Sequence, residues 1–354
     1  MFRPTRIGAA AALAAFGLIS TATAAAETSA AAAAPRKLLL GDAYPIDVSV
    51  SLHKGLLHWM DSLTNLKGAG LTGGKTALSH QWQYERVHGK PTARDVEMLR
   101  QFHRTRLAYA RRARPEERNR LTLAFFAAPD LEQALQSASE LLDEQAARAF
   151  AESVRYFVPR YKTIWQAGLI PKEFVEQAMA SEHRKAVADF LVGVARFFGV
   201  SPTQEPRPHL VLVPVPSDNA THAQAIGRFL LIEIRRGESL ADEVAPIVHE
   251  NVHLLYSRIE SSRLEELMQA VFEGQAPNHD AEHRLREALP TAIAQGVAGE
   301  VFQDGRWSPD HTWYHIAAVD RYAKRIFPIV KRALTAGDSF DSAFLSKVIA
   351  AYDP

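Results

Sequence analysis

The chain has 354 residues, and its 41 lysines and arginines nearly balance its 40 aspartates and glutamates, for a formal net charge of +1. This length supports a large core in one or two domains, and a near-neutral balance without a basic block gives no reason to expect nucleic-acid binding. The sequence contains no cysteine, so we expect neither disulfides nor a cysteine-linked lipid anchor.

The first 26 residues have the pattern of a secretory signal peptide. Two arginines precede a short apolar run over residues 7–19, and residues 24–26 fit an A-x-A cleavage site. The run is too short to span a bilayer about 30 Å thick as an ordinary transmembrane helix. We therefore expect an exported protein, periplasmic or secreted, with no stable membrane insertion after the signal is removed. Residues 27–36 are predicted to be a disordered linker.

Residues 37–204 are predicted to form a mainly helical region. A strand is expected around Ile46 to Leu52, and beyond it apolar residues recur at three- and four-residue spacing, which is typical of amphipathic helices. The predicted helices are Lys54 to Leu66, Thr92 to Arg112, Glu116 to Ala127, Leu131 to Tyr161 with a break near Pro159, and Pro171 to Phe198.

Residues 205–354 are predicted to form a second region with a small sheet. Strand-like runs at His209 to Val215 and Phe229 to Ile234 lead into a helix, which Ser239 and Asp242 begin with capping-box spacing. Only helices are expected after that point. The predicted fold class is therefore α+β and predominantly helical.

The helix that follows Ser239 carries His249-Glu250-Asn251-Val252-His253, an H-E-x-x-H motif. In a helix the two histidines lie one turn apart on one face, with side-chain origins ~5 to 6 Å apart, so they can share one zinc ion with Glu250 beside it as a general base. Zinc lowers the pKa of a bound water from ~15.7 to about 7. Apolar residues flank the motif, and buried ionisable groups cost several kcal/mol unless they are paired or metal-bound. The motif thus predicts a site for one Zn²⁺.

A catalytic zinc site needs a third protein ligand and an open position for water. The metzincin extension is absent, because Tyr256 and Ile259 stand where that pattern has glycine and histidine. Glu287 is the leading candidate for the third ligand, and Glu300 is the alternative. Pro290, three residues after Glu287, predicts a kink in the helix that carries it.

These residues resemble the gluzincin branch of the zincin-like metallopeptidases, in which H-E-x-x-H is followed by a glutamate on a later helix. The resemblance covers roughly residues 205 to 335 and rests on His249, Glu250, His253 and Glu287. It implies a zincin-like catalytic core, a peptide or protein substrate, and pairing of an extended substrate with the strand before the active-site helix.

A last helix is predicted from Ser308, as N-cap with Pro309 in the first helical position, toward Ala336. Tyr314 and His315 lie in this segment. The resemblance implies that a downstream tyrosine or histidine stabilises the oxyanion of the reaction, a role worth about 2.7 to 4 kcal/mol. Both residues are therefore candidate catalytic groups.

The sequence as a whole predicts an exported zinc metallopeptidase, a hydrolase in which Glu250 activates a water for attack on a peptide bond. Two alternatives stay open. One is a non-catalytic exported binding or scaffold protein with a structural or vestigial metal site, and the other is a zinc amidohydrolase with a non-protein substrate. A reversed motif, His279 to His283, is predicted to be a surface helix. No oligomeric state is predicted.

Overall fold

The structure is a computed structural model, and the described residues belong to one compact unit that covers residues 35–354. The predicted signal peptide, residues 1–26, and the predicted linker, residues 27–36, lie outside the described residues. The described ranges are 43–63, 75–114, 117–167, 181–215, 222–235, 237–272, 279–303 and 305–353.

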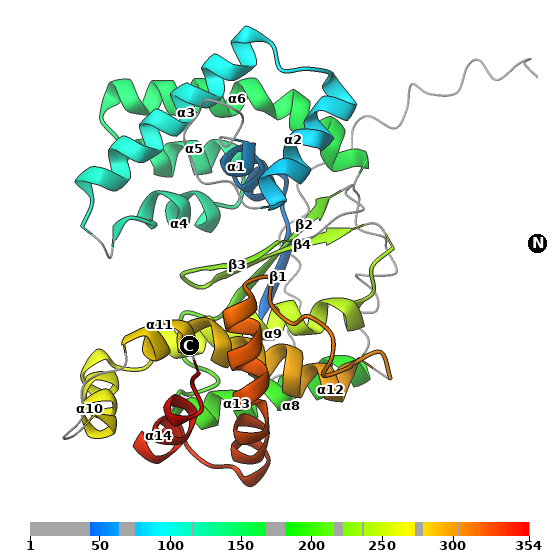
Figure 1. The fold of residues 1–354 in the computed structure, drawn as a ribbon. Coiled ribbons are helices and arrows are strands. Elements are labelled where there is room, and N and C mark those ends of the chain that lie inside the picture. The colour runs from blue at the N-terminus through cyan, green and yellow to red at the C-terminus, as the bar shows by residue number, and fades with distance from the viewer. Residues whose placement is uncertain are drawn as a thin grey trace, which may run out of the picture. The chain divides into compact units, whose positions relative to one another are not determined.

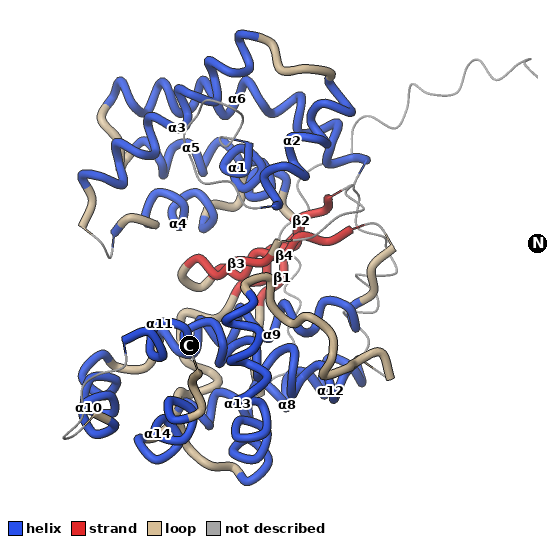
Figure 2. The backbone as a smooth tube through the Cα atoms, viewed as in Figure 1, coloured by secondary structure: helices blue, strands red, loops and turns tan. Residues whose placement is uncertain are grey.

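The described residues include a four-stranded mixed sheet with the strand order β1-β2-β4-β3 (Figure 2). Its strands are β1 (Asp47–Val50), β2 (His209–Val215), β3 (Ala223–Ile226) and β4 (Phe229–Arg235). β2 pairs in parallel with both β1 and β4, whereas β3 runs antiparallel to β4. β2 is buried along its whole length, as parallel strands are when helices cover both faces.

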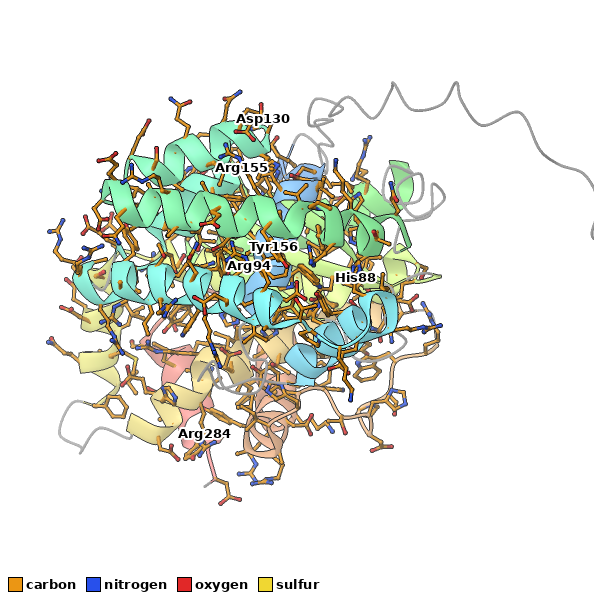
Figure 3. The ribbon with its side chains drawn as sticks, turned by 90° about the horizontal axis from the view of Figure 1, so that it is seen from above. His88, Arg94, Asp130, Arg155, Tyr156 and Arg284 are labelled. Carbon is orange, nitrogen blue, oxygen red and sulfur yellow. The ribbon has the colours of Figure 1, made fainter. Side chains whose placement is uncertain are left out.

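One face of the sheet is covered by helices from the first half of the chain (Figure 1). The residues Val211, Val213 and Leu231 point into the core on this side. Seen from above, Arg94 lies beside Tyr156 (Figure 3), and its guanidinium carbon is 5.9 Å from the tyrosine ring centre. The helices are α1 (Leu52–Leu63), α2 (Lys75–His88), α3 (Ala93–Arg112), α4 (Arg120–Ala127), α5 (Leu131–Ser139) and α6 (Glu144–Ala167).

The single helix predicted over Leu131 to Tyr161 is wrong, because α5 and α6 are separate helices. The break falls between Ser139 and Glu144, where the Asp143 carboxylate accepts a hydrogen bond from the backbone N–H of Ala146 at 2.8 Å. An aspartate in this position caps the start of a new helix. Pro159, where the break was predicted, lies inside α6.

The other face of the sheet is covered by α8 and by helices from the second half of the chain (Figure 1). Leu212, Ile232 and Ile234 of the sheet pack here against Val248 and Val252. None of the helices in the described ranges is both long and apolar enough to cross a membrane. The elements are α8 (Ser181–Phe198), α9 (Leu240–Ser257), α10 (Ser261–Val271), α11 (His279–Thr291), the π-helix η2 (Ala292–Ala298), α12 (Gly299–Phe302), α13 (Ala317–Ala336) and α14 (Ser342–Ala350).

These layers confirm the predominantly helical α+β class, but the start predicted for the last helix is wrong. α13 begins at Ala317 rather than after Ser308. The carboxylate of Asp320, in the first turn of α13, accepts hydrogen bonds from the backbone N–H groups of Trp313 at 2.5 Å and Tyr314 at 3.0 Å. These two hydrogen bonds hold the segment before α13 as a loop against the first turn of that helix.

The start of α9 is the one that the sequence predicts. Ser239 and Asp242 form a capping box, in which the backbone N–H of Ser239 donates to the Asp242 carboxylate at 2.9 Å. The box satisfies backbone groups that the first helical turn leaves unpaired. It therefore fixes where α9 begins and which of its residues face the sheet.

We predict that Ser239→Ala lowers the free energy of unfolding by about 1 kcal/mol, because it removes the serine side chain of the capping box, whose hydroxyl donates to the Asp242 carboxylate at 2.6 Å. Ser308→Ala is the matched control: Ser308 has the sequence pattern of a cap but precedes no helix, so its loss should change stability by less than about 0.5 kcal/mol. Urea unfolding of both variants measures the difference. Equal destabilisation by the two substitutions would contradict the assignment of the α9 cap.

Candidate metal centre

α9 and α11 bring three of the predicted site residues together. The Nε2 atoms of His249 and His253 lie 3.0 Å apart, and Oε2 of Glu287 lies 3.6 Å from the first and 3.5 Å from the second. A tetrahedral zinc with bonds of about 2.0 to 2.2 Å holds its ligand atoms about 3.3 to 3.6 Å apart. The two distances to Glu287 have this spacing, and the two imidazole nitrogens, 3.0 Å apart, would have to separate slightly to share a zinc ion. The donor set of two imidazoles and a carboxylate suits zinc.

Glu300, the alternative third ligand, is not in this cluster. Its carboxylate lies 2.7 Å from the ammonium group of Lys331, and the side chain is exposed near the end of the short helix α12. Of the two glutamates that the sequence offered, the structure brings only Glu287 to the imidazoles.

The cluster is open on one side. The exposed fractions of the side chains are 12% for His249, 27% for His253 and 39% for Glu287. All three line a cavity of about 680 Å³ together with Glu250 and Tyr314. A structural zinc site is closed by four protein ligands, whereas a catalytic one keeps a position for water. The exposed fractions and the cavity match the second arrangement.

Glu250 lies in the wall of the same cavity with 6% of its surface exposed. Burial raises the pKa of its carboxyl group, while His249, His253 and a hydrogen bond from the backbone of Ala225 partly oppose that rise. A carboxylate with a raised pKa is a stronger base. Glu250 thus has the position and the basicity that proton abstraction beside the cluster requires.

The charges in the cluster favour a cation. Burial alone would raise the pKa of Glu287, but hydrogen bonds from His249 and His253 and the nearby imidazole charge outweigh it, so the pKa of this carboxyl is lowered. Burial opposes protonation of His253, yet Glu287 and Glu250 raise its pKa above the usual value. Negative charge that holds a proton on the imidazole also attracts a metal ion at the same place.

Tyr314 reaches the cluster from the loop before α13. Its hydroxyl donates a hydrogen bond to Oε2 of Glu287 at 2.9 Å, and its ring stacks on His249 with 6.1 Å between ring centres. Burial, followed by the charge of Glu287, raises the tyrosine pKa, so the hydroxyl keeps its proton and remains a donor. His315 lines the same cavity but is exposed, with its ring 4.5 Å from that of Tyr314.

Contacts behind the ligands fix their orientation. Asn251, inside the motif, is fully buried; its amide donates to the carbonyl of Ile247 at 2.8 Å and accepts from the hydroxyl of Tyr44 at 3.2 Å. On the other helix, the hydroxyl of Thr291 donates to the carbonyl of Glu287 at 2.7 Å. The Tyr44–Asn251 bond therefore ties α9 to a distant segment of the chain, whereas the other two bonds lie within single helices.

The kink predicted at Pro290 has a specific form. Pro290 lies in the last turn of α11, and the chain continues directly as the π-helix η2. Proline cannot donate the usual backbone hydrogen bond, and π-helical turns are frequent at functional sites. The indole N–H of Trp307 donates to the carbonyl of Gln295 in η2 at 2.7 Å. Gln295 of this π-helix also lines the cavity.

The strand next to the cavity differs from the prediction. β4, the strand before α9, cannot pair with an added strand because β2 and β3 occupy both of its edges. β3 is the outer strand of the sheet, and its residues Gln224 and Ala225 line the cavity. β3 is only four residues long, too short for its sequence pattern to predict a strand. The two-residue Gly227-Arg228 turn before β4, with Gly227 at φ 55°, is a hairpin signal that identifies it.

A second group of possible metal ligands has no counterpart in the sequence analysis. His58, His80 and Glu233 offer ligand atoms within 4.8 Å of one another on the buried side of the sheet that faces α1 and α2. No local motif identifies them, since they come from three elements far apart in the chain.

The chain matches no protein-family model, and no curated protein and no solved structure is recognisably similar to it.

We predict that Glu287→Gln weakens zinc binding about a hundredfold or more, because the amide replaces the anionic ligand of the cluster. Glu300→Gln, which changes a glutamate paired with Lys331, should leave zinc affinity unchanged. Competition with a chromophoric chelator gives both dissociation constants. An unchanged constant for Glu287→Gln, or a matching loss for Glu300→Gln, would exclude Glu287 as the third ligand.

Proposed function

We propose that this chain is an exported zinc-dependent hydrolase, and specifically a metallopeptidase. The observation that carries the proposal is the convergence of His249, His253 and Glu287, with ligand atoms 3.0 to 3.6 Å apart, in an open cavity that has Glu250 in its wall. When bound there, zinc would acidify a water and polarise the substrate carbonyl. Export is supported by the signal-peptide pattern of residues 1–26.

Glu250 is the proton carrier in this mechanism. It accepts a proton from the attacking water as the water oxygen bonds to the carbonyl carbon, and it delivers that proton to the amine nitrogen as the carbon–nitrogen bond breaks. The hydrogen bond from the backbone of Ala225 orients its carboxylate toward this task. The resemblance to gluzincins supports the same role, because the glutamate of H-E-x-x-H is the base in that pattern.

Tyr314 is the donor to the developing oxyanion. Its hydroxyl stays protonated and already lies in the cavity, 2.9 Å from a carboxylate oxygen of Glu287. A preorganised donor of this kind stabilises negative charge that appears only in the transition state. His315 is exposed on the same wall and is proposed to contact the substrate rather than the oxyanion.

The outer strand β3 favours a peptide over other substrates with an amide bond. It lines the cavity beside Glu250, and its edge away from β4 pairs with no strand in the described ranges. An extended peptide can add to such an edge through backbone hydrogen bonds, which hold it without requiring one particular sequence. The open cluster also favours a hydrolase over a protein whose zinc is only structural.

We predict that Glu250→Gln retains zinc but lowers turnover of a peptide library by about 100-fold to 10,000-fold, because the amide cannot accept the proton. Zinc content and cleavage are measured on the same preparations of this variant, of the wild type and of Glu300→Gln as the control. Cleavage at the wild-type rate by the Glu250→Gln variant would remove Glu250 from the mechanism. Absence of cleavage by zinc-loaded wild type over a broad library would remove the peptidase assignment.

Tyr314→Phe tests the oxyanion donor separately. At saturating zinc we expect kcat to fall about 100-fold to 1000-fold with little change in KM, since the lost interaction forms mainly in the transition state. Tyr322→Phe is the matched control, because the hydroxyl of Tyr322 donates to the carbonyl of Val348 outside the cavity. The Tyr322→Phe substitution should lower the stability of the protein but leave kcat and KM unchanged. A rise in KM at constant kcat for Tyr314→Phe would contradict the assigned role.

A further inference from the structure

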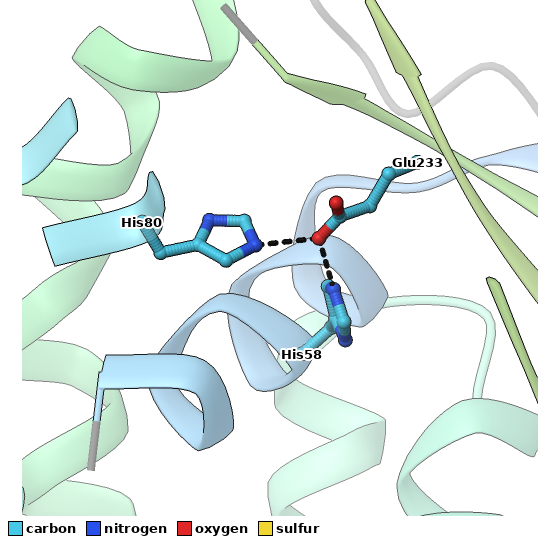
Figure 4. Close-up of side chains that lie close together, drawn as sticks. All are labelled: His58, His80 and Glu233. Atoms are coloured by element: carbon cyan, nitrogen blue, oxygen red, sulfur yellow. Dashed lines mark hydrogen bonds and ion pairs between the residues drawn. The ribbon is translucent and has the colours of Figure 1, made fainter. Parts of the chain in front are cut away.

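Two imidazoles and a carboxylate meet in the interior on the far side of the sheet from α9 (Figure 4). Oε1 of Glu233 in β4 lies 2.7 Å from Nε2 of His58 in α1 and 2.5 Å from Nε2 of His80 in α2. The exposed fractions are 7% for His58 and 2% for each of the other two side chains. The group is therefore buried as well as compact.

Strand alternation separates this group from the first metal centre. Ile232 and Ile234 point into the core that contains α9, so Glu233 between them points to the opposite face, toward α1 and α2. The two clusters are thus independent in their ligands, and neither shares a residue with the other.

Protein hydrogen bonds alone do not satisfy the polar atoms around Glu233. Nδ1 of His80 and the hydroxyl of Tyr161 are buried without a hydrogen-bond partner in the described part of the chain. Tyr161 is close enough to Glu233 for the carboxylate charge to help raise the pKa of the tyrosine, after the larger effect of burial. A buried carboxylate with two imidazoles and further unpaired polar atoms nearby is costly unless a cation or ordered water completes it.

We propose that His58, His80 and Glu233 form a second site for a divalent transition metal ion of the zinc type. Two neutral imidazole nitrogens and one carboxylate oxygen are a donor set that such ions prefer over calcium or magnesium. Binding requires the ligand atoms to move from 2.5 and 2.7 Å to about 3.3 Å apart.

The surroundings of Glu233 already resemble those of a metal-bound carboxylate. Its second oxygen, Oε2, accepts a hydrogen bond from the backbone N–H of His222 at 2.9 Å, which leaves Oε1 for the metal. The ring of His222 stacks on that of His58, with ring centres 5.8 Å apart and 5° between planes. His222 also lines the cavity of the first centre. The second metal would therefore join α1 and α2 to the strands that form the cavity wall.

The decisive experiment removes the first centre and counts the remaining metal. The full-length His249→Ala, His253→Ala double variant is loaded with zinc, passed through a desalting column and measured for zinc per chain. We expect one equivalent, and none when His58→Ala is added. His53→Ala is the matched control, because this buried imidazole of the same helix uses both ring nitrogens in hydrogen bonds to Ser51 and Ala128. It should keep the equivalent.

Two further measurements keep the test decisive if a histidine variant does not fold. Wild-type protein should bind two zinc ions per chain, and removal of the second by a chelator should lower the melting temperature by about 5 °C or more. A folded double variant without zinc would overturn the second site, as would a wild type that binds one zinc ion and loses it on His249→Ala, His253→Ala substitution. Neither readout involves peptide cleavage, so failure here is distinguishable from failure of the proposed peptidase function.

Discussion

The contact between Glu287 and the two imidazoles of α9 is the interaction on which the functional account depends. It joins two helices through charge, since the carboxylate lies 3.6 and 3.5 Å from the two Nε2 atoms. α9 can present those imidazoles because its other side is fixed in the core by Val248 and Val252 and by the buried amide of Asn251. The same helix is thus apolar toward the sheet and polar toward the cavity.

The sheet gives the molecule two chemically distinct faces. Hydrophobic residues alternate along β4 toward both cores, and Glu233 is the exception, a buried carboxylate among them. Its oxygens contact residues from α1, α2 and the segment that starts β3. β3 also lines the cavity of the first metal centre, on the other face of the sheet. The contacts of Glu233 therefore support the strand that borders that cavity. In this fold, the packing of the helices from the first half of the chain is therefore coupled to the geometry of the cavity.

The sequence predicted those features that local chemistry determines. Ser239 and Asp242 located the start of α9, and the H-E-x-x-H spacing placed His249 and His253 together. A similar local pattern wrongly predicted a helix start at Ser308. The Asp320 carboxylate accepts hydrogen bonds from two backbone N–H groups and so holds the segment that contains Tyr314 as a loop. The His58–Glu233 contact spans 175 positions, so no spacing rule reveals it. The sequence also favoured Glu287 over Glu300 as the third ligand, and the packing of α11 against α9 brings the carboxylate of Glu287 to the two imidazoles.

Anomalous X-ray diffraction at the zinc edge from crystals of the zinc-loaded chain would locate the metal ion and its ligands. We expect a peak within about 2.0 to 2.2 Å of His249 Nε2, His253 Nε2 and Glu287 Oε2, with at least one further position occupied by solvent. A peak bound by four protein side chains would contradict a catalytic centre. No peak at these three atoms in zinc-loaded crystals would contradict the metal centre itself.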